Sequence, residues 1–371
     1  MRGTRGLLPA AALLFAGTLG GLIVLEAAVR LQAVGEERRQ GRLVRDLAGV
    51  PAPRPGSTVG LGQMIRRSTN PRTVYELQPR LDVVFSGGRV TTSDSGFRGA
   101  DVTKPKPPGV FRIVGIGDSY MFGQGVSDAE TYLSALPGLL SRVVPGLSVE
   151  TVNLAVPGFN TVMEVELAKA RAAELEPDII LIEIVGNDLD LPNFLWNPVD
   201  PWSLKKSFLI EFVRARIGSH PDHGLSVPGL RDAPRSPGAS SDTFSRTESD
   251  VPAAYASLVG LPAFNRAIVD LAGLGNARGI PVMAMTQGVW FEDDMISALT
   301  QAGIPVLVLR SALRQKARSL GAPDYARSLL SLGPSDLHPS ALGHGVIAEE
   351  LAGWLAREHA DALSRTRARP D

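Results

Sequence analysis

Short apolar runs alternate with amphipathic segments along most of this 371-residue chain, and this alternation restricts its fold more than any other feature. Residues 111–117 and 178–185 are largely apolar runs of strand length, and residues 149–154 are predicted as a further strand. Between them, in residues 129–143 and 161–175, leucine, valine and alanine recur at three- and four-residue intervals, as in helices that bury one face. Strands that alternate with helices in this way predict a parallel sheet.

The same alternation continues toward the C-terminus. The later elements are predicted as a helix over 261–277, a strand over 280–286, a helix over 292–301, a strand over 305–309 and a helix over 340–358. The chain is therefore predicted to form an α/β domain with a central, mostly parallel sheet flanked by helices.

Residues that can carry chemistry follow the first three strands or precede the last helix. Ser119 lies in Gly-Asp-Ser-Tyr after the first strand, Gly158 after the second, and Asn187 in Gly-Asn-Asp after the third. Asp336 and His338 come shortly before the last helix, on a predicted loop. Ligands of open α/β sheets bind at the carboxyl ends of the strands, so we expect these residues to converge there.

Together these residue types suit attack on a carbonyl carbon. A serine hydroxyl such as that of Ser119 needs a base, which His338 can supply, and Asp336 can fix the tautomer of the imidazole. The charge that develops on the carbonyl oxygen needs preorganised donors. The backbone N–H groups of Ser119 and Gly158 and the side-chain amide of Asn187 can provide them.

In their order and composition these segments resemble the SGNH or GDSL-type serine hydrolases, over about residues 111–358. The resemblance implies a three-layer sandwich of the flavodoxin-like kind. It implies that Ser119 is the nucleophile, that Ser119, Gly158 and Asn187 form the oxyanion hole, and that His338 and Asp336 are the base and its orienting acid. The leucine that usually follows Gly-Asp-Ser in the family is a tyrosine here.

Three functions remain open on this reading. The first is hydrolysis of acyl esters, O-acetyl esters included, on an envelope glycan or lipid. The second is transfer of the acyl group to a polysaccharide hydroxyl, because a triad does not itself choose between water and an alcohol. The third is a catalytically silent binding or assembly role on the same fold, against which the intact set of site residues argues.

Other motifs are less informative. Gly-Ile-Gly-Asp-Ser-Tyr at 115–120 lacks the third glycine of a dinucleotide fingerprint, so no cofactor is expected. Asp118, Asp188 and Asp190 could suggest a divalent metal, but no further acidic or histidine cluster nearby completes a shell, so we expect solvated loop carboxylates and no metal. Glu183 interrupts an apolar strand, where a structural ion pair would be needed. The histidines other than His338 are expected at the surface or in loops: His220, His223, His344 and His359.

Composition narrows the function further. The chain has 38 basic and 38 acidic side chains, so nothing calls for a nucleic-acid partner, and no protein partner can be named from the sequence. It has no cysteine, which excludes disulfides, thiolate metal sites and a cysteine nucleophile.

The N-terminus carries a second strong signal. No charged residue occurs from Gly6 to Leu25, which is long enough to cross a membrane as one helix; a cleaved signal peptide is the alternative. Arg2 and Arg5 favour a cytoplasmic N-terminus, whereas arginines after the span favour the reverse. Large domains translocate largely regardless of such charges, so we expect a single-pass protein with its hydrolase domain outside the cytoplasm.

The remaining boundaries follow from composition. The chain is predicted to comprise a tail (1–5), a transmembrane anchor (6–33), a linker (34–70), short strands and turns that pack on the domain (71–110), the hydrolase domain (111–360) with an insertion (191–260), and a C-terminal tail (361–371). Aromatic residues in the first part of the insertion predict a cap over the site: Trp196, Trp202, Phe208 and Phe212.

Overall fold

A computed structural model of the chain describes residues 7–46, 52–195, 202, 204, 207–217, 251–288, 292–334 and 336–358. Four residues with predicted positions lie outside these residues, as do both predicted tails: Trp196, His220, His223 and His359.

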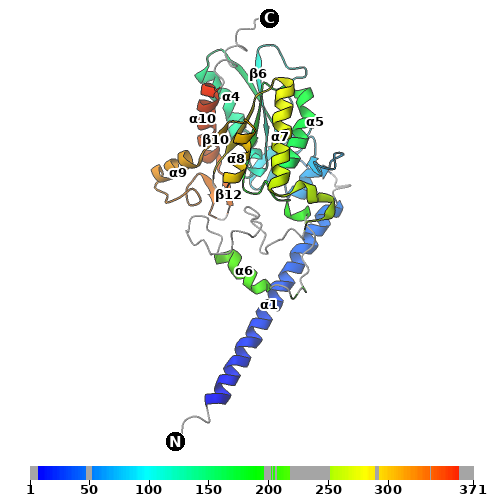
Figure 1. The fold of residues 1–371 in the computed structure, drawn as a ribbon, viewed down its shortest axis with the longest axis vertical. Helices are drawn as coiled ribbons and strands as arrows, with labels where there is room; N and C mark the ends of the chain where they lie inside the picture. Colours follow the sequence, from blue (N-terminus) through cyan, green and yellow to red (C-terminus); the bar gives the residue numbers. More distant parts are fainter. Residues whose placement is uncertain are drawn as a thin grey trace.

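The centre of the molecule is a parallel five-stranded sheet in the order β10-β9-β8-β6-β7 (Figure 1). Its strands are β6 (Val110–Ile116), β7 (Ser148–Asn153), β8 (Ile179–Glu183), β9 (Val282–Thr286) and β10 (Val306–Val308). The order changes direction at β6, whose two neighbours are β7 and β8, and a ligand site is expected at such a switch point.

Helices cover both faces of the sheet, which confirms the predicted three-layer α/β architecture. On one face α4 (Tyr132–Val143) packs against α10 (Ala341–Glu358), and on the other α5 (Thr161–Leu175) packs against α7 (Gly260–Arg278) (Figure 1). Two smaller helices complete these layers: α8 (Asp293–Gln301) contacts α7, and α9 (Arg310–Ser319) contacts α10.

The predicted helices and strands of the domain are all present, with boundaries shifted by a few residues, but α9 was not predicted. Its sequence is rich in basic and polar residues, and only Leu313 and Ala317 are buried. An apolar stripe of two residues four positions apart is too narrow to stand out as a helical pattern.

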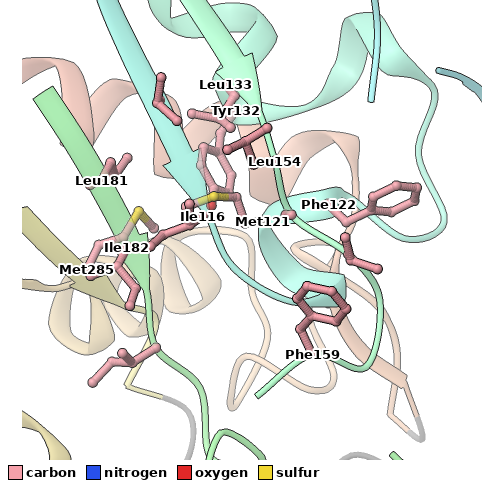
Figure 2. Close-up of a cluster of buried hydrophobic side chains, with 14 of the residues drawn as sticks. Ile116, Met121, Phe122, Tyr132, Leu133, Leu154, Phe159, Leu181, Ile182 and Met285 are labelled. Atoms are coloured by element: carbon pink, nitrogen blue, oxygen red, sulfur yellow. The ribbon is translucent and has the colours of Figure 1, made fainter. Parts of the chain in front are cut away.

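The core fills the space between β6, β8 and the helices that follow them. Figure 2 shows Ile116 and Leu181 of neighbouring strands with Met121, Leu133 and Leu154 packed around them. All residues of β8 are buried, as expected for a central strand covered on both faces.

The segment before the sheet forms two small sheets. One is β1 (Ser57–Val59), β4 (Asp82–Phe85) and β5 (Gly88–Thr91), and the other is β2 (Ile65–Arg67) and β3 (Tyr75–Leu77), with the short helix α2 (Leu61–Met64) between β1 and β2. The short strands predicted within 71–110 are therefore present, as β3, β4 and β5. Packed structure starts at Ser57, however, inside the stretch assigned to a linker, because Met64 and Ile65 are buried in the main core.

Helix α1 (Leu7–Asp46) is 40 residues long and extends away from the domain (Figure 1). Residues Ala12–Gln32 are long and apolar enough to cross a membrane, and a signal sequence would meet the same test. The helix continues to Asp46, well past the predicted end of the anchor.

The insertion contributes the 3₁₀ turn η2 (Asn193–Leu195), helix α6 (Phe208–Ile217) and the 3₁₀ turn η4 (Ala253–Leu258). Phe208 and Phe212 were predicted to cover the site, but they pack with Val29 of α1. The long N-terminal helix thus supplies an apolar partner for these two side chains that sequence proximity could not reveal, and a cap over the site stays a prediction.

Candidate active site

The turn after β6 places Ser119 at the edge of the sheet. Asp118 is the N-cap of the short helix α3 (Ser119–Phe122), and its carboxylate accepts a hydrogen bond from the Tyr120 backbone N–H at 2.8 Å. The chain can turn this sharply because Gly117 lacks a side chain: a Cβ there would lie 2.7 Å from Met121 Cβ. The local sequence thus dictates where the serine hydroxyl points.

Asp336 and His338 lie on a strand, not on the predicted loop. β12 (Asp336–Pro339) pairs with β11 (Ser331–Gly333) in an antiparallel hairpin. Residues two apart on a strand share one face, so both side chains point the same way. The pairing of Ser331 with Pro339 is a hairpin contact that single-sequence periodicity does not reveal.

A continuous hydrogen-bonded chain joins the two segments. His338 Nε2 lies 2.8 Å from Ser119 Oγ, and His338 Nδ1 lies 2.5 Å from Asp336 Oδ1. Burial tends to raise the pKa of Asp336, but the hydrogen bonds and charge of His338 outweigh it and lower that pKa below its usual value. The Tyr120 ring, 4.5 Å from the imidazole centroid to centroid, packs against His338 and limits its rotation.

Asn187 reaches the same place from the loop after β8. Its side-chain amide donates to Asp118 Oδ2 at 3.1 Å, and Ser119 Oγ lies 3.2 Å from the same oxygen. Asp118 is buried, which raises the pKa of its carboxyl. An amide nitrogen has two N–H groups, so anchoring one on Asp118 leaves the other with a fixed direction.

Gly158 has a backbone conformation that only glycine adopts easily. Its φ is +81°, and a Cβ would lie 2.9 Å from the Tyr75 hydroxyl and 3.2 Å from Pro192 Cβ. Tyr75 itself donates to the Pro157 carbonyl at 2.9 Å, which fixes the peptide that precedes Gly158. The structure therefore brings Ser119, Gly158 and Asn187 to the carboxyl ends of β6, β7 and β8, as the strand order requires.

Sequence reasoning missed two supporting residues from the N-terminal segment. Tyr75 is one, and Arg98 is the other: the Arg98 guanidinium is buried, donates to the Gly123 carbonyl at 2.7 Å and pairs with Asp128 at 2.8 Å. Both hold loops that flank Ser119. No motif marks them, because their partners lie about 25 to 80 residues further along the chain.

The expected ion pair of Glu183 is wrong. Glu183 accepts hydrogen bonds from the Tyr132 hydroxyl at 2.7 Å and from Gln287 Nε2 at 3.1 Å, and complete burial raises its pKa to about 8. Gln287 in turn lies within 3.4 Å of the Tyr325 hydroxyl, which also contacts the Leu337 carbonyl of β12 at 3.3 Å. The buried acid therefore belongs to a neutral network that supports the hairpin.

The expectation of solvated carboxylates is wrong for Asp118 and Asp188. Asp188 is only 1% exposed and accepts from Thr161 Oγ1 at 3.0 Å and from the Val185 N–H at 3.1 Å. Its pKa is raised well above the usual value, first by burial and then by the charge of Asp118. Within the described residues, no group of three or more His, Cys, Asp or Glu side chains could hold a metal ion.

His344, expected at the surface, is fully buried in α10. Its Nδ1 accepts from the Tyr132 backbone N–H at 3.3 Å, and burial followed by the charges of Arg98 and His338 lowers its pKa to about 3. Its role is thus structural and neutral: it joins α10 to the start of α4.

The fold and the hydrogen-bonded serine, histidine and acid define an α/β protein with a hydrolase-type site. The model of the GDSL-like lipase/acylhydrolase family matches residues 116–346, well over half of the chain. The chain belongs to this family and is an enzyme that acts on ester bonds.

Several solved structures are similar, all at low sequence identity. TesA aligns with a TM-score of 0.39 and 12% identity, covering 66% of this chain and 98% of its own. An acetylxylan esterase from Geobacillus stearothermophilus aligns with a TM-score of 0.35 and 15% identity over 70% of this chain and 95% of its own. A lipase/acylhydrolase from Enterococcus faecalis aligns with a TM-score of 0.35 and 14% identity, covering 67% of this chain and 96% of its own. A comparison with curated proteins finds no match.

Proposed function

We propose that the protein is a serine esterase that works through an acyl-enzyme. The observation that carries this proposal is the chain of contacts from Ser119 Oγ to His338 Nε2 and from His338 Nδ1 to Asp336. His338 takes the hydroxyl proton as Ser119 attacks the acyl carbonyl, and then gives that proton to the departing alcohol. Water, activated by the same imidazole, releases the acid and restores the serine.

The negative charge on the carbonyl oxygen is stabilised by the Ser119 and Gly158 backbone N–H groups and by the Asn187 amide. The positive φ of Gly158 and the Tyr75 contact to Pro157 support this role, since they fix the direction of that backbone. The Asp118 hydrogen bond does the same for Asn187. Donors that are already oriented need no reorganisation as charge develops.

Asn187→Ala is expected to lower kcat for ester hydrolysis by about 10²-fold, with a smaller change in KM, because the amide acts on charge that exists mainly in the transition state. Steady-state kinetics on a soluble ester measure both constants. Asn276→Ala, on the exposed side of α7, is the matched control. An unchanged kcat in Asn187→Ala would show that the amide only anchors Asp118.

We further propose that α1 is a retained single-pass anchor, that the hydrolase domain lies outside the cytoplasm, and that the substrate is an acyl ester of an envelope glycan or lipid. Retention is supported by contacts of α1 with the folded chain: Glu26 accepts a hydrogen bond from Ser207 at 2.8 Å, and Val29 is buried against Phe208. Cleavage behind these residues would remove a packed part of the structure.

Acid release from short-chain, long-chain and acetylated-sugar esters by the full chain in lipid nanodiscs tests the proposed reaction. An organophosphate should label Ser119 and stop turnover. Labelling without acid release would indicate transfer to a sugar hydroxyl, which an added acetyl acceptor would reveal. A folded protein that neither turns over nor becomes labelled would contradict the proposal and favour a binding role.

A further inference from the structure

Helix α6 is capped by a residue of α1. The Glu26 carboxylate accepts hydrogen bonds from Ser207 Oγ at 2.8 Å and from the backbone N–H groups of Phe208 and Leu209 at 2.9 and 2.8 Å. These are the groups that a helix N-terminus leaves unsatisfied, and a negative charge is favourable there. The start of α6 is thus fixed to one point on α1.

Further contacts hold the two helices together. Arg30 pairs with Glu26 at 2.7 Å, and its guanidinium lies 4.7 Å from the centre of the Phe208 ring. Phe208 is buried with Val29, and Leu209 and Phe212 pack on this pair. One face of α6 therefore packs against α1.

The position of Glu26 along α1 determines how deep the contact between α1 and α6 would lie in a membrane. Glu26 is the first charged residue after the uncharged stretch 6–25. The part of α1 from Leu7 to Leu25, at about 1.5 Å a residue, extends about 30 Å, which is the thickness of the hydrocarbon core. If the uncharged residues 6–25, the N-terminal part of the predicted anchor 6–33, span the hydrocarbon core, Glu26 and the helix that it caps lie at the level of the lipid headgroups.

Around α6, large apolar side chains remain exposed. Leu204 is 95% exposed, Ile210 52% and Val213 44%, and Trp202 is also largely exposed. Between positions 205 and 217 the sequence has four basic residues and one acidic residue. Apolar side chains, a tryptophan and an excess of basic residues in one segment are typical of helices that lie in the interface of an anionic bilayer.

We propose that Trp202, Leu204, Ile210 and Val213 form a membrane-docking surface that inserts into the headgroup region of the bilayer that α1 spans. This inference rests on the proposed membrane anchor. Figure 1 shows β12, which carries Asp336 and His338, at the end of the domain that faces α6. η2, a few residues beyond Asn187, contacts α1 as well. Docking would hold the site toward the lipid surface and favour esters presented there.

Because the chain has no cysteine, an environment-sensitive fluorophore such as NBD can be attached at single introduced sites of the full-length protein. The variants are Leu204→Cys, Ile210→Cys and Val213→Cys. Val269→Cys is the control, since Val269 is 64% exposed on α7. All variants are measured in nanodiscs containing phosphatidylglycerol. The labels at 204, 210 and 213 are expected to fluoresce about twofold or more brighter, and at shorter wavelength, than the label at 269, which faces buffer.

Phe15→Cys separates failure of the anchor from failure of the docking surface. If its label is not shielded by lipid, the anchor is wrong and the docking surface is overturned with it. If it is shielded while the labels at 204, 210 and 213 match the control, docking alone is overturned. If the labels at 204, 210 and 213 become shielded without lipid and only at high protein concentration, a second copy of the chain covers this surface, and the proposal is overturned. Turnover of a soluble ester, measured on the same samples, reports the hydrolase separately.

Glu26→Gln tests what holds the surface in place. It keeps the shape of the side chain and removes the charge that caps α6. We expect the labels at 210 and 213 to lose lipid shielding in this background while the label at 15 keeps it. Unchanged shielding at 210 and 213 would overturn the role of Glu26 in positioning the docking surface.

Discussion

Ser119→Ala is expected to lower kcat/KM for ester hydrolysis by about 10³-fold or more. The reason is geometric: Ser119 Oγ is the hydroxyl that contacts His338 Nε2, at a distance of 2.8 Å. Without this oxygen no acyl-enzyme can form, and only the oxyanion donors and substrate binding can accelerate direct attack by water. Acid release from a soluble ester, with purified and correctly folded protein, measures the loss.

Comparison with the partners of Ser119 makes this test sharper. His338→Ala should cost about as much as Ser119→Ala, and the double variant should be little worse than either, because residues that act in one step are not additive. Ser319→Ala, on the exposed end of α9, should leave kcat/KM unchanged. Losses of Ser119→Ala and His338→Ala that multiply in the double variant would contradict a shared step.

The sequence was sufficient to predict that the site residues converge. Ser119 and Asn187 follow neighbouring parallel strands, so the topology itself brings them to one edge of the sheet. Asp336 and His338 share a face because of their spacing of two, although the strand that produces this arrangement was not foreseen.

What the sequence did not predict depends on tertiary packing. Glu183, Asp188 and His344 are polar residues whose burial is decided by helices and strands distant in the chain, so local pattern assigned them to an ion pair or to the surface. Tyr75 lies in the N-terminal segment but supports the Gly158 loop. Such contacts leave no periodicity and no motif in a single sequence.

The second large effect concerns stability and pH, and it comes from Glu183. Burial raises the pKa of this carboxyl from 4.5 to about 8 in the folded protein. Between these two values the folded state keeps a proton that the unfolded state has released. The free energy of unfolding therefore falls as pH rises from about 4.5 to about 8, and this contribution levels off above pH 8.

By linkage, a shift of this size corresponds to about 3–5 kcal/mol across that window. Glu183→Gln removes the titration but keeps the shape of the side chain. Its carbonyl oxygen can still accept from Gln287, and its amide can donate to the Tyr132 hydroxyl, which then acts as acceptor. We expect the variant to be about as stable as the original protein near pH 5 and clearly more stable at pH 8.

Urea unfolding of both proteins between pH 5 and 9 checks this, and the difference between them isolates Glu183 from other buried groups. His344 acts in the opposite direction: its pKa is lowered to about 3, so its contribution is lost as pH falls from 6.5 toward 3, mostly below the window used here. Glu350→Gln, on the exposed face of α10, should show no pH-dependent difference. If the difference in unfolding free energy between Glu183→Gln and the original protein were the same at all pH values, Glu183 would be charged in the folded protein. Its two hydrogen-bond donors, Tyr132 and Gln287, would then have to stabilise that charge.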